Sequence, residues 1–163
     1  MSKISPCLWF DTQAEEAVAF YTSIFKNSRI VEIARYGDVG QEIHGGKPGS
    51  VMTIAFELEG QRFTALNGGP IFKFTEAISL QVDVRSQEEL DYYWSRLNEG
   101  GDPNAQQCGW LKDKFGLSWQ IVPRQLIDMI LDKDKAKSER SFAAMLQMKK
   151  LDIAKLEAAY SGA

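Results

Sequence analysis

Cysteine is scarce in this sequence: Cys7 and Cys108 are the only two, too few for a disulfide framework. A reducing compartment, the cytoplasm, is therefore the expected location. Lysine and arginine number 19 against 22 aspartates and glutamates, so no basic surplus exists to attract a nucleic-acid backbone. No apolar run approaches the roughly 20 residues that span a bilayer, and residues 1–6 contain no apolar signal-peptide core. We thus expect neither nucleic acid nor a membrane as a partner.

The 163 residues are enough for one domain, or for two small modules that share a core. In the first 70 residues, the pattern predicts a strand, a helix and three more strands. Thr12-Gln13-Ala14-Glu15 is a capping box, and apolar residues recur at helical spacing behind it. Residues 37–49 carry five glycines and one proline, which predicts a flexible loop or lid. The expected strands are residues 4–10, 30–36, 51–58 and 62–67, with a hairpin turn between the last two.

The same order of elements begins again after residue 70. A second capping box, Ser86-Gln87-Glu88-Glu89, follows the first by about 74 residues and opens a helix with its own apolar stripe. An internal duplication of this kind predicts two similar half-sheets, each of which buries one face on its helix. Paired side by side, the half-sheets would present their other faces as one concave surface, which we call the cup. The expected strands of the second half are residues 76–84, 107–112 and 117–122.

Residues 124–163 are predicted to be helical and lie outside the duplication. Pro123 can open a helix at its first position, and Asp152 can cap the last helix. We expect this extension to pack either on its own chain or on a partner. The methionine-rich stretch 145–148 suits an interface, although methionine also fills gaps in an ordinary core.

Several stretches along the chain carry the residues of a known family pattern. The stretches are Pro6-Cys7-Leu8-Trp9-Phe10-Asp11, Ala65-Leu66-Asn67-Gly68-Gly69-Pro70, Cys108-Gly109-Trp110-Leu111-Lys112-Asp113 and the helical tail from Met145 to Asp152. They resemble the PhnB-like proteins of the glyoxalase/bleomycin-resistance/dioxygenase superfamily, also called vicinal oxygen chelate proteins. The resemblance covers nearly the whole chain.

The resemblance implies an α+β, glyoxalase-like fold. Two βαβββ modules, residues 1–70 and 71–123, would form a cupped mixed sheet within a single domain spanning residues 1–163, and residues 124–163 would form its C-terminal helical extension. Proteins of this group usually form homodimers. Members often carry the label 3-demethylubiquinone-9 3-methyltransferase, but no glycine-rich strand-to-helix turn suited to a nucleotide cofactor is visible in the sequence.

Strand alternation assigns side chains to the two faces of each predicted strand. Leu8 and Phe10 are expected to face the first helix, and Ile78 and Val82 the second. Asn67 ends its strand at the position where, by the resemblance, the superfamily often keeps a ligand carboxylate. The candidate residues of the cup lining are Cys7, Trp9, Asn67, Ser79, Gln81, Trp110 and Gln120.

Metal ligands are missing from these candidate positions. The superfamily's enzymes commonly hold a divalent metal with inward-facing histidines and glutamates, which suit first-row metals. The candidates here are neutral, and the burial of a dication without anionic ligands is costly. We therefore expect no metal and no cofactor. The single histidine, His44, lies in the glycine-rich loop, where it is either a solvated side chain or a loop-borne ligand or general base.

Several candidates have a structural interpretation as well as a functional one. Trp9 and Trp110 could stack on a planar ligand, or they could pack as large apolar side chains. Asn67 and Gln120 could orient a polar ligand, or they could satisfy backbone groups at strand ends. Cys7 is a candidate nucleophile or an inert, small apolar side chain.

These residues favour one function and leave three others open. The first is a protein that binds a small-molecule ligand in the cup without covalent chemistry. The second is a metal-dependent isomerase, lyase or dioxygenase of the superfamily. The third is a metal-free enzyme that uses Cys7 or His44 to transfer a group, such as the methyl group that the family label suggests. The fourth is an interaction scaffold whose cup has lost its use. Fold alone cannot choose among them, because function depends on the site.

Overall fold

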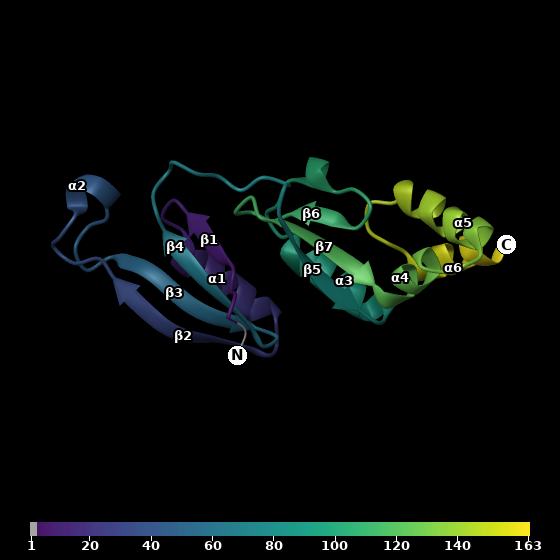
Figure 1. Cartoon of the computed structure of the whole chain (residues 1–163), viewed down its shortest axis with the longest axis horizontal. Helices are drawn as coiled ribbons and strands as arrows, with labels where there is room; N and C mark the ends of the chain where they lie inside the picture. Colours follow the sequence, from purple (N-terminus) through teal and green to yellow (C-terminus); the bar gives the residue numbers. More distant parts are fainter. Residues whose placement is uncertain (1–2) are drawn as a thin grey trace. The chain divides into compact units, whose positions relative to one another are not determined.

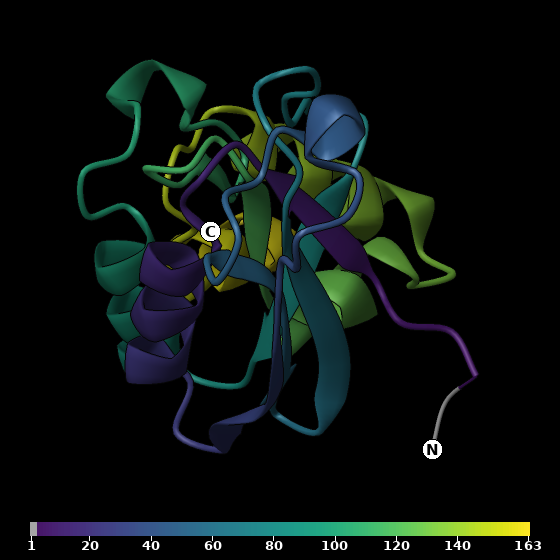
Figure 2. The same cartoon turned by 90° about the vertical axis from the view of Figure 1, so that its left-hand side faces the viewer.

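A computed structural model describes residues 3–163 and shows a mixed α+β protein, as the sequence predicts. The chain divides into two compact units, Met1–Phe74 and Thr75–Ala163, each with its own sheet. In Figure 1 the first unit runs from purple to teal and the second from teal to yellow. Figure 2 gives a second view of the same ribbon. In the part of the chain that the structure describes, no helix has the length and apolar character needed to cross a membrane.

The first unit folds as a βαβββ module, as predicted. Its elements are β1 (Cys7–Phe10), α1 (Ala14–Ile24), β2 (Ser28–Arg35), α2 (Gln41–His44), β3 (Val51–Leu58) and β4 (Gln61–Asn67). The sheet has the order β1-β4-β3-β2, in which β1 and β4 are parallel and the other neighbours are antiparallel. The short helix α2 lies in the glycine-rich loop between β2 and β3, as Figure 1 shows.

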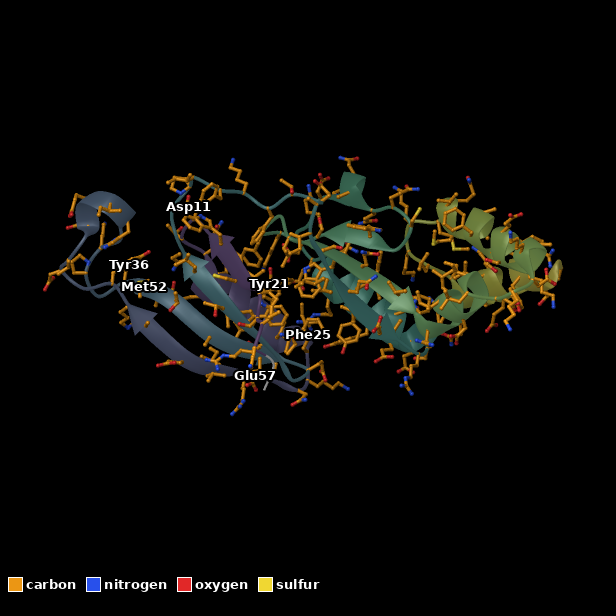
Figure 3. All side chains as sticks on the ribbon, in the orientation of Figure 1. Asp11, Tyr21, Phe25, Tyr36, Met52 and Glu57 are labelled. Carbon is orange, nitrogen blue, oxygen red and sulfur yellow. The ribbon has the colours of Figure 1, made fainter. Side chains whose placement is uncertain are left out.

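The predicted apolar stripe of α1 forms the core of this unit. Tyr21 is fully buried, and its ring stacks on Phe56 of β3 with centroids 6.5 Å apart. Phe56 in turn stacks on Phe63 of β4, with centroids 5.4 Å apart. Figure 3 labels Tyr21 on this helix and Phe25, the residue that follows it. Burial of each large apolar side chain stabilises the fold by about 1.5–3 kcal/mol. The buried members of the stripe are Ala14, Ala17, Val18, Tyr21, Ile24 and Phe25.

A hairpin turn joins β3 to β4, as predicted, and it consists of two residues because β4 begins at Gln61. Glu59 and Gly60 have φ angles of 47° and 81°, and the strand pairing closes on both sides of them with Leu58 opposite Gln61. Two successive residues with positive φ make a type I′ turn, whose twist matches that of the flanking strands. Glycine adopts this conformation without steric cost, which explains its place in the turn.

The second unit repeats the strand relations of the first. Its elements are β5 (Ser79–Val84), α3 (Gln87–Leu97), the 3-10 helix η1 (Pro103–Ala105), β6 (Trp110–Lys112), β7 (Ser118–Pro123), α4 (Arg124–Ile130), α5 (Lys135–Leu146) and α6 (Ile153–Ser161). Its sheet has the order β5-β7-β6, with β5 parallel to β7 and β7 antiparallel to β6. In the first unit β1, β4 and β3 are related in the same way. The duplication that the capping boxes suggest is therefore present in the topology.

The second module differs from the predicted βαβββ order in one respect. A βαβββ module has four strands, whereas the described part of this sheet has three, and no counterpart of β2 follows α3. Residues 98–109 instead form a loop with η1 and an isolated bridge between Gln107 and Trp110. This segment contains neither a β-branched nor an aromatic residue, a composition that disfavours a strand. The second module is thus βαββ.

The helices that follow β1 and β5 are capped in different ways. Ser86 caps α3 as predicted, because its Oγ accepts a hydrogen bond from the Glu89 N–H at 3.1 Å. The capping box predicted for α1 is wrong, since Gln13 precedes the helix and its side chain makes no capping hydrogen bond. The Ala14 N–H instead donates to Asn67 Oδ1 at 2.8 Å. A residue 53 positions away in the sequence thus replaces the local cap.

The C-terminal extension packs on the second unit itself, which is one of the two expected alternatives. The Gln87 side chain, at the start of α3, donates to Leu151 O at 3.2 Å and accepts from the Ile153 N–H at 2.9 Å. The Cys108 N–H, in the loop before β6, donates to Met148 O at 2.8 Å. These bonds attach the segment between α5 and α6 to α3 and to the loop that precedes β6.

Two further expectations for the extension can be compared with the structure. Asp152 caps α6, as predicted, by accepting a hydrogen bond from the Lys155 N–H at 3.0 Å. In the methionine-rich stretch, Met145 and Met148 are half-buried and Leu146 is 43% exposed. This stretch is therefore neither a closed core nor a fully exposed surface.

Strand alternation predicts that Ile78 faces α3, but its side chain is 55% exposed. The reason is local, because β5 begins one residue later and the Ile78 N–H donates to Thr75 O in a turn. Within the strand itself alternation holds, and Val82 and Val84 are buried. The prediction fails only where the extended conformation has not yet begun.

A buried carboxylate organises the turn between β6 and β7. Asp113 is 2% exposed, and its Oδ1 accepts hydrogen bonds from the N–H groups of Phe115 at 2.9 Å and Leu117 at 3.0 Å. Its Oδ2 accepts from the Trp119 indole Nε1 at 2.9 Å. A buried charge is tolerated when it is paired or well hydrogen-bonded, and these donors meet that condition. The carboxylate therefore holds both the turn and the Trp119 ring in place.

The substitution Asp113→Ala should lower the free energy of unfolding by about 3 kcal/mol, because it leaves buried donors without an acceptor. Asp113→Asn should cost less, about 1–2 kcal/mol, since its amide oxygen can still accept the backbone bonds while its NH2 group faces the indole N–H. Urea unfolding measures both variants against Asp128→Asn, an exposed position on α4 that should change stability by no more than about 0.5 kcal/mol. Equal stability of Asp113→Ala and this control would contradict the anchoring role.

Candidate functional site

Each sheet packs one face on its own helix, and we call the opposite side the open face. In the first unit, Cys7 pairs with Thr64, and Trp9 pairs with Leu66, which also pairs with Thr53 on β3. Residues that are directly opposite in a ladder project from the same side of the sheet. The first open face therefore consists of Cys7, Trp9, Thr53, Ala55, Thr64 and Leu66.

The second unit has an open face of its own, and it carries most of the predicted lining residues. Gln120 on β7 pairs with both Gln81 on β5 and Trp110 on β6. Two residues earlier on β7, Ser118 pairs with both Ser79 on β5 and Lys112 on β6. The second open face consists of Ser79, Gln81, Trp110, Lys112, Ser118 and Gln120, of which Ser118 is buried. Four of the seven predicted lining residues thus lie together on one sheet.

Trp9 is half-buried and held in one orientation on the first open face. Its indole Nε1 donates to Gly69 O at 2.9 Å, and the Phe72 ring meets it edge-on with centroids 4.9 Å apart. A Cβ atom added at Gly68 would lie 2.3 Å from the indole, so only glycine allows this close approach. The chain after β4 therefore fixes the ring, and Phe72, which is 62% exposed, extends the aromatic surface.

The structure gives Cys7 no sign of activation and places Cys108 in a turn. Cys7 is exposed on the first open face, yet desolvation by the surrounding atoms raises the pKa of its thiol. A catalytic cysteine needs a thiolate, which a lowered pKa provides. Cys108 lies in the loop before β6 with a left-handed backbone (φ 50°), and its N–H is bonded to Met148 O. The arrangement favours the inert alternative for Cys7 and a turn position for Cys108.

Asn67 lies on the helix-facing side of the sheet, since it pairs with Phe10 and follows Leu66 of the open face. Its side-chain amide bonds to backbone groups on two other elements. Besides accepting from the Ala14 N–H on α1, it donates to Val51 O on β3 at 3.1 Å. These bonds correspond to the structural interpretation of this residue, in which the amide satisfies backbone groups at the ends of elements.

His44 is held inside the loop between β2 and β3. Its Nδ1 accepts a hydrogen bond from the Gly46 N–H at 2.9 Å, and its Nε2 lies 3.0 Å from Val39 O, to which it can donate. The imidazole stacks on Tyr36 with centroids 4.4 Å apart, and the Tyr36 hydroxyl donates to Asn67 O at 2.6 Å. Figure 3 shows Tyr36 at the base of this loop. With both ring nitrogens engaged, His44 orders the loop instead of projecting freely from it.

On the second open face, polar side chains lie next to an indole. Gln120 Nε2 donates to Ser79 Oγ at 2.9 Å, so two of the predicted lining residues are in direct contact. Trp110 is half-buried and Gln81 is exposed. No residue among those described accepts a hydrogen bond from the Trp110 indole N–H. This face therefore offers a ring surface together with donors and acceptors that can meet a ligand.

Lys112 is a charged member of the second open face and was not among the predicted lining residues. It projects from the same side as Trp110, two positions earlier on β6. Its ammonium forms an ion pair with Glu76 and lowers the pKa of that carboxyl, chiefly through the hydrogen bond between them. The Lys112 side chain is 26% exposed and that of Glu76 is 62% exposed. The alternation that assigns Trp110 to the lining is a signal that assigns Lys112 to it as well.

The residues of the open faces do not fit a divalent metal of the glyoxalase type. Within residues 3–163, no three histidine, cysteine, aspartate or glutamate side chains lie close enough to hold an ion. Apart from single carboxylates further along each sheet, Glu57 on β3 and Asp83 on β5, the open faces present hydroxyls, amides, indoles, a thiol and an ammonium, none of which neutralises a dication. Glu57, further along the first sheet, is paired with Arg29 at 2.8 Å.

The strand-to-helix turns do not fit a nucleotide cofactor either. Such a site needs a close backbone approach and free N–H groups at the start of a helix. Residues 11–13, between β1 and α1, contain no glycine, and the first N–H of α1 is bonded to Asn67. At the start of α3, the Glu89 N–H is bonded to Ser86.

Comparison with known proteins identifies a family and a fold. Residues 2–122 match the family model described as 3-demethylubiquinone-9 3-methyltransferase. A solved structure of a PhnB protein from Bacillus cereus, which bears the same methyltransferase name, is 39% identical with a TM-score of 0.63. The match covers 75% of this chain and 99% of that one. No curated protein matches the chain.

Two more distant structures share the fold. A protein from Pseudomonas aeruginosa is 20% identical with a TM-score of 0.57, over 76% of this chain and 98% of that one. The fosfomycin resistance protein FosX from Listeria monocytogenes is 15% identical with a TM-score of 0.54, over 81% of this chain and 98% of that one. At these identities the likeness concerns the fold alone, which is the glyoxalase-like α+β fold that the sequence predicts.

The double role of Asn67 gives a stability test with a matched control. Asn67→Ala should lower the free energy of unfolding by about 2–3 kcal/mol, because it removes the α1 cap and the bond to Val51 O together. Ser86→Ala removes a helix cap alone and should cost about 1 kcal/mol. Urea unfolding ranks the two variants. If Asn67→Ala costs no more than Ser86→Ala, the bond to β3 contributes nothing.

The raised pKa of Cys7 predicts slow alkylation at neutral pH, because desolvation disfavours the thiolate. In a Cys108→Ser variant, the rate of reaction with iodoacetamide should rise with pH to a midpoint above that of a free cysteine, about 8.5. N-acetylcysteine in the same buffers provides the reference. A midpoint below that of the reference would instead identify Cys7 as an activated nucleophile.

Proposed function

Because the chain belongs to the 3-demethylubiquinone-9 3-methyltransferase family of PhnB-like proteins, we propose that it binds a small organic molecule without a glyoxalase-type metal. The proposed ligand has a planar ring that stacks on tryptophan and polar groups that meet the amides and hydroxyls of the open faces. Binding is non-covalent. The residues proposed to bind it are Ser79, Gln81, Trp110 and Gln120 on the second open face, and Cys7 and Trp9 form a separate candidate surface on the first.

One observation carries this proposal: the second open face has hydrogen-bonding capacity that the fold does not use. The bond from Gln120 Nε2 to Ser79 Oγ leaves the Gln120 Oε1 acceptor and the Ser79 hydroxyl proton for a ligand. The Trp110 ring lies in the next position across the sheet, opposite Gln120. Ligand sites in proteins combine aromatic surface with a few orienting polar groups, and this face has both.

The first open face supports the same interpretation through its rigidity. Trp9 is fixed by the bond to Gly69 O and by the Phe72 ring, so its side chain has little rotamer freedom left to lose. A ligand that stacks on an ordered ring is bound at a lower entropy cost than one that must order it first. Asn67 and His44 are not part of the proposed site, because their polar atoms bond to backbone groups within the unit.

The enzyme alternatives receive less support from the same residues. A metal-dependent isomerase, lyase or dioxygenase needs a set of anionic or imidazole ligands that the open faces do not offer. A thiol-dependent group transfer needs an activated Cys7, whose pKa is instead raised by desolvation. The methyl transfer in the family's name is not part of our proposal, since neither strand-to-helix turn fits a nucleotide cofactor.

The proposal includes a homodimer in the cytoplasm. Both cysteines are free, which is the state that a reducing compartment maintains. Sedimentation equilibrium measures the mass of the assembly, and a monomer at all concentrations would contradict the dimer without affecting the ligand proposal.

A screen of small aromatic amides and acids by thermal shift and NMR titration tests ligand binding. Compounds that bind the wild-type protein should bind Trp110→Leu about fivefold more weakly, because the loss of aromatic stacking costs about 1 kcal/mol. Phe142→Leu, which alters an exposed aromatic on α5, is the control and should leave the affinity unchanged. Failure of every compound to bind at millimolar concentration would overturn the proposal. Metal analysis of protein purified without chelators should find no stoichiometric Zn, Ni, Mn or Fe.

A further inference from the structure

The ion pair between Lys112 and Glu76 lies on the second open face and has no role in the core. We infer that Lys112 is the anion-binding residue of this face and that its ligand is a small aromatic monocarboxylate. In the absence of the ligand, Glu76 pairs with Lys112, and the ligand displaces it. This inference rests on the proposed function and narrows its ligand from organic molecules in general to one charged class.

The positions of Lys112 and Trp110 fit a ring that carries a carboxylate. The two residues project from the same side of β6 at positions i and i+2, which are roughly 7 Å apart along a strand. Opposite Lys112 lies Ser118, and beyond it Ser79, whose hydroxyl proton is available. A ring stacked on Trp110 therefore directs its carboxylate toward an ammonium, and the Ser79 hydroxyl lies two strands away from Lys112 on the same face.

Glu76, the ion-pair partner of Lys112, is weakly held. Glu76 precedes β5 in an exposed segment, and its side chain is 62% exposed. An exposed ion pair of this kind contributes only about 0–1 kcal/mol, so its loss is a small cost to an incoming ligand. Lys112, by contrast, is 26% exposed and stays on the sheet surface. A ligand carboxylate can replace the Glu76 oxygen with an equivalent charge-assisted hydrogen bond.

A second acidic group lies further along this face and restricts the charge of the ligand. Asp83 is two positions beyond Gln81 on β5 and is exposed. Its carboxylate would repel a second anionic substituent directed along the strand, whereas Gln81 and Gln120 can bond to a neutral polar group there. A monoanion thus suits the face better than a dianion.

Benzoate and benzamide are a matched pair of probes, because they have the same shape and differ in charge. NMR titration of the full chain should show tighter binding of benzoate than of benzamide. Glu76→Gln should tighten benzoate binding at least threefold and leave benzamide unchanged, because the competing carboxylate is gone. Lys112→Met should abolish the preference for benzoate, while its unchanged affinity for benzamide shows that the face is intact. Asp128→Asn removes the acidic partner of a surface ion pair on α4 and should alter neither affinity.

The outcomes separate this inference from the function on which it rests. Equal binding of the two probes, unaffected by Glu76→Gln and Lys112→Met, overturns the assignment of Lys112 and leaves the proposed function standing. Failure of both probes and of all other aromatic compounds to bind overturns the proposed function and the inference with it. A benzoate preference that depends on Lys112 and increases in Glu76→Gln supports both.

Discussion

A β-sheet that packs on a single layer of helix can bury only one of its faces, and this constraint determines where a site can form in this protein. Side chains alternate along a strand, so the residues between the buried ones must project from the other side. In the first unit Leu8 and Phe10 are buried while Cys7 and Trp9 are not. In the second, Trp119 and Ile121 are buried while Gln120 is half exposed. The open faces are thus a consequence of core formation.

The geometry of the open faces depends on polar groups that tie strand ends to their neighbours. Asn67 joins the end of β4 to the start of α1 and to β3. Asp113 has the corresponding function in the second unit, where it holds the turn that leads from β6 to β7 and the ring of Trp119. Such buried polar groups are well hydrogen-bonded, and they position side chains more rigidly than apolar contacts alone.

The chemistry of the open faces differs from the metal-binding pattern that the sequence resemblance implies. That pattern consists of inward-facing histidines and glutamates, whereas the open faces present mainly amides, hydroxyls and indoles. The single histidine instead stacks on Tyr36 and orders a loop. The positive charge of Lys112 on the second open face is paired with the carboxylate of Glu76, which lies in an exposed segment. The family therefore indicates the fold, and the side chains of the open faces determine what the protein can bind.

The amino-acid sequence by itself determined the features that arise from neighbours within a few positions. The apolar stripe of α1, the turn at Glu59 and Gly60, the Ser86 cap and the alternation of faces all follow from local spacing, and all could be predicted. Among residues 3–163, the second sheet has no fourth strand, and the cause is local: residues 98–109 contain three glycines and no β-branched or aromatic residue. Four of the lining residues of the second open face could be named for the same reason.

Only the tertiary structure decided which distant groups meet. The cap of α1 comes from Asn67, and the partner of Lys112 is Glu76. Local spacing cannot reveal these contacts, because strand register and loop closure bring the two partners together, and both are properties of the folded chain. The strand pattern could show which residues share a face, whereas the fold alone showed which of them remain available to a ligand.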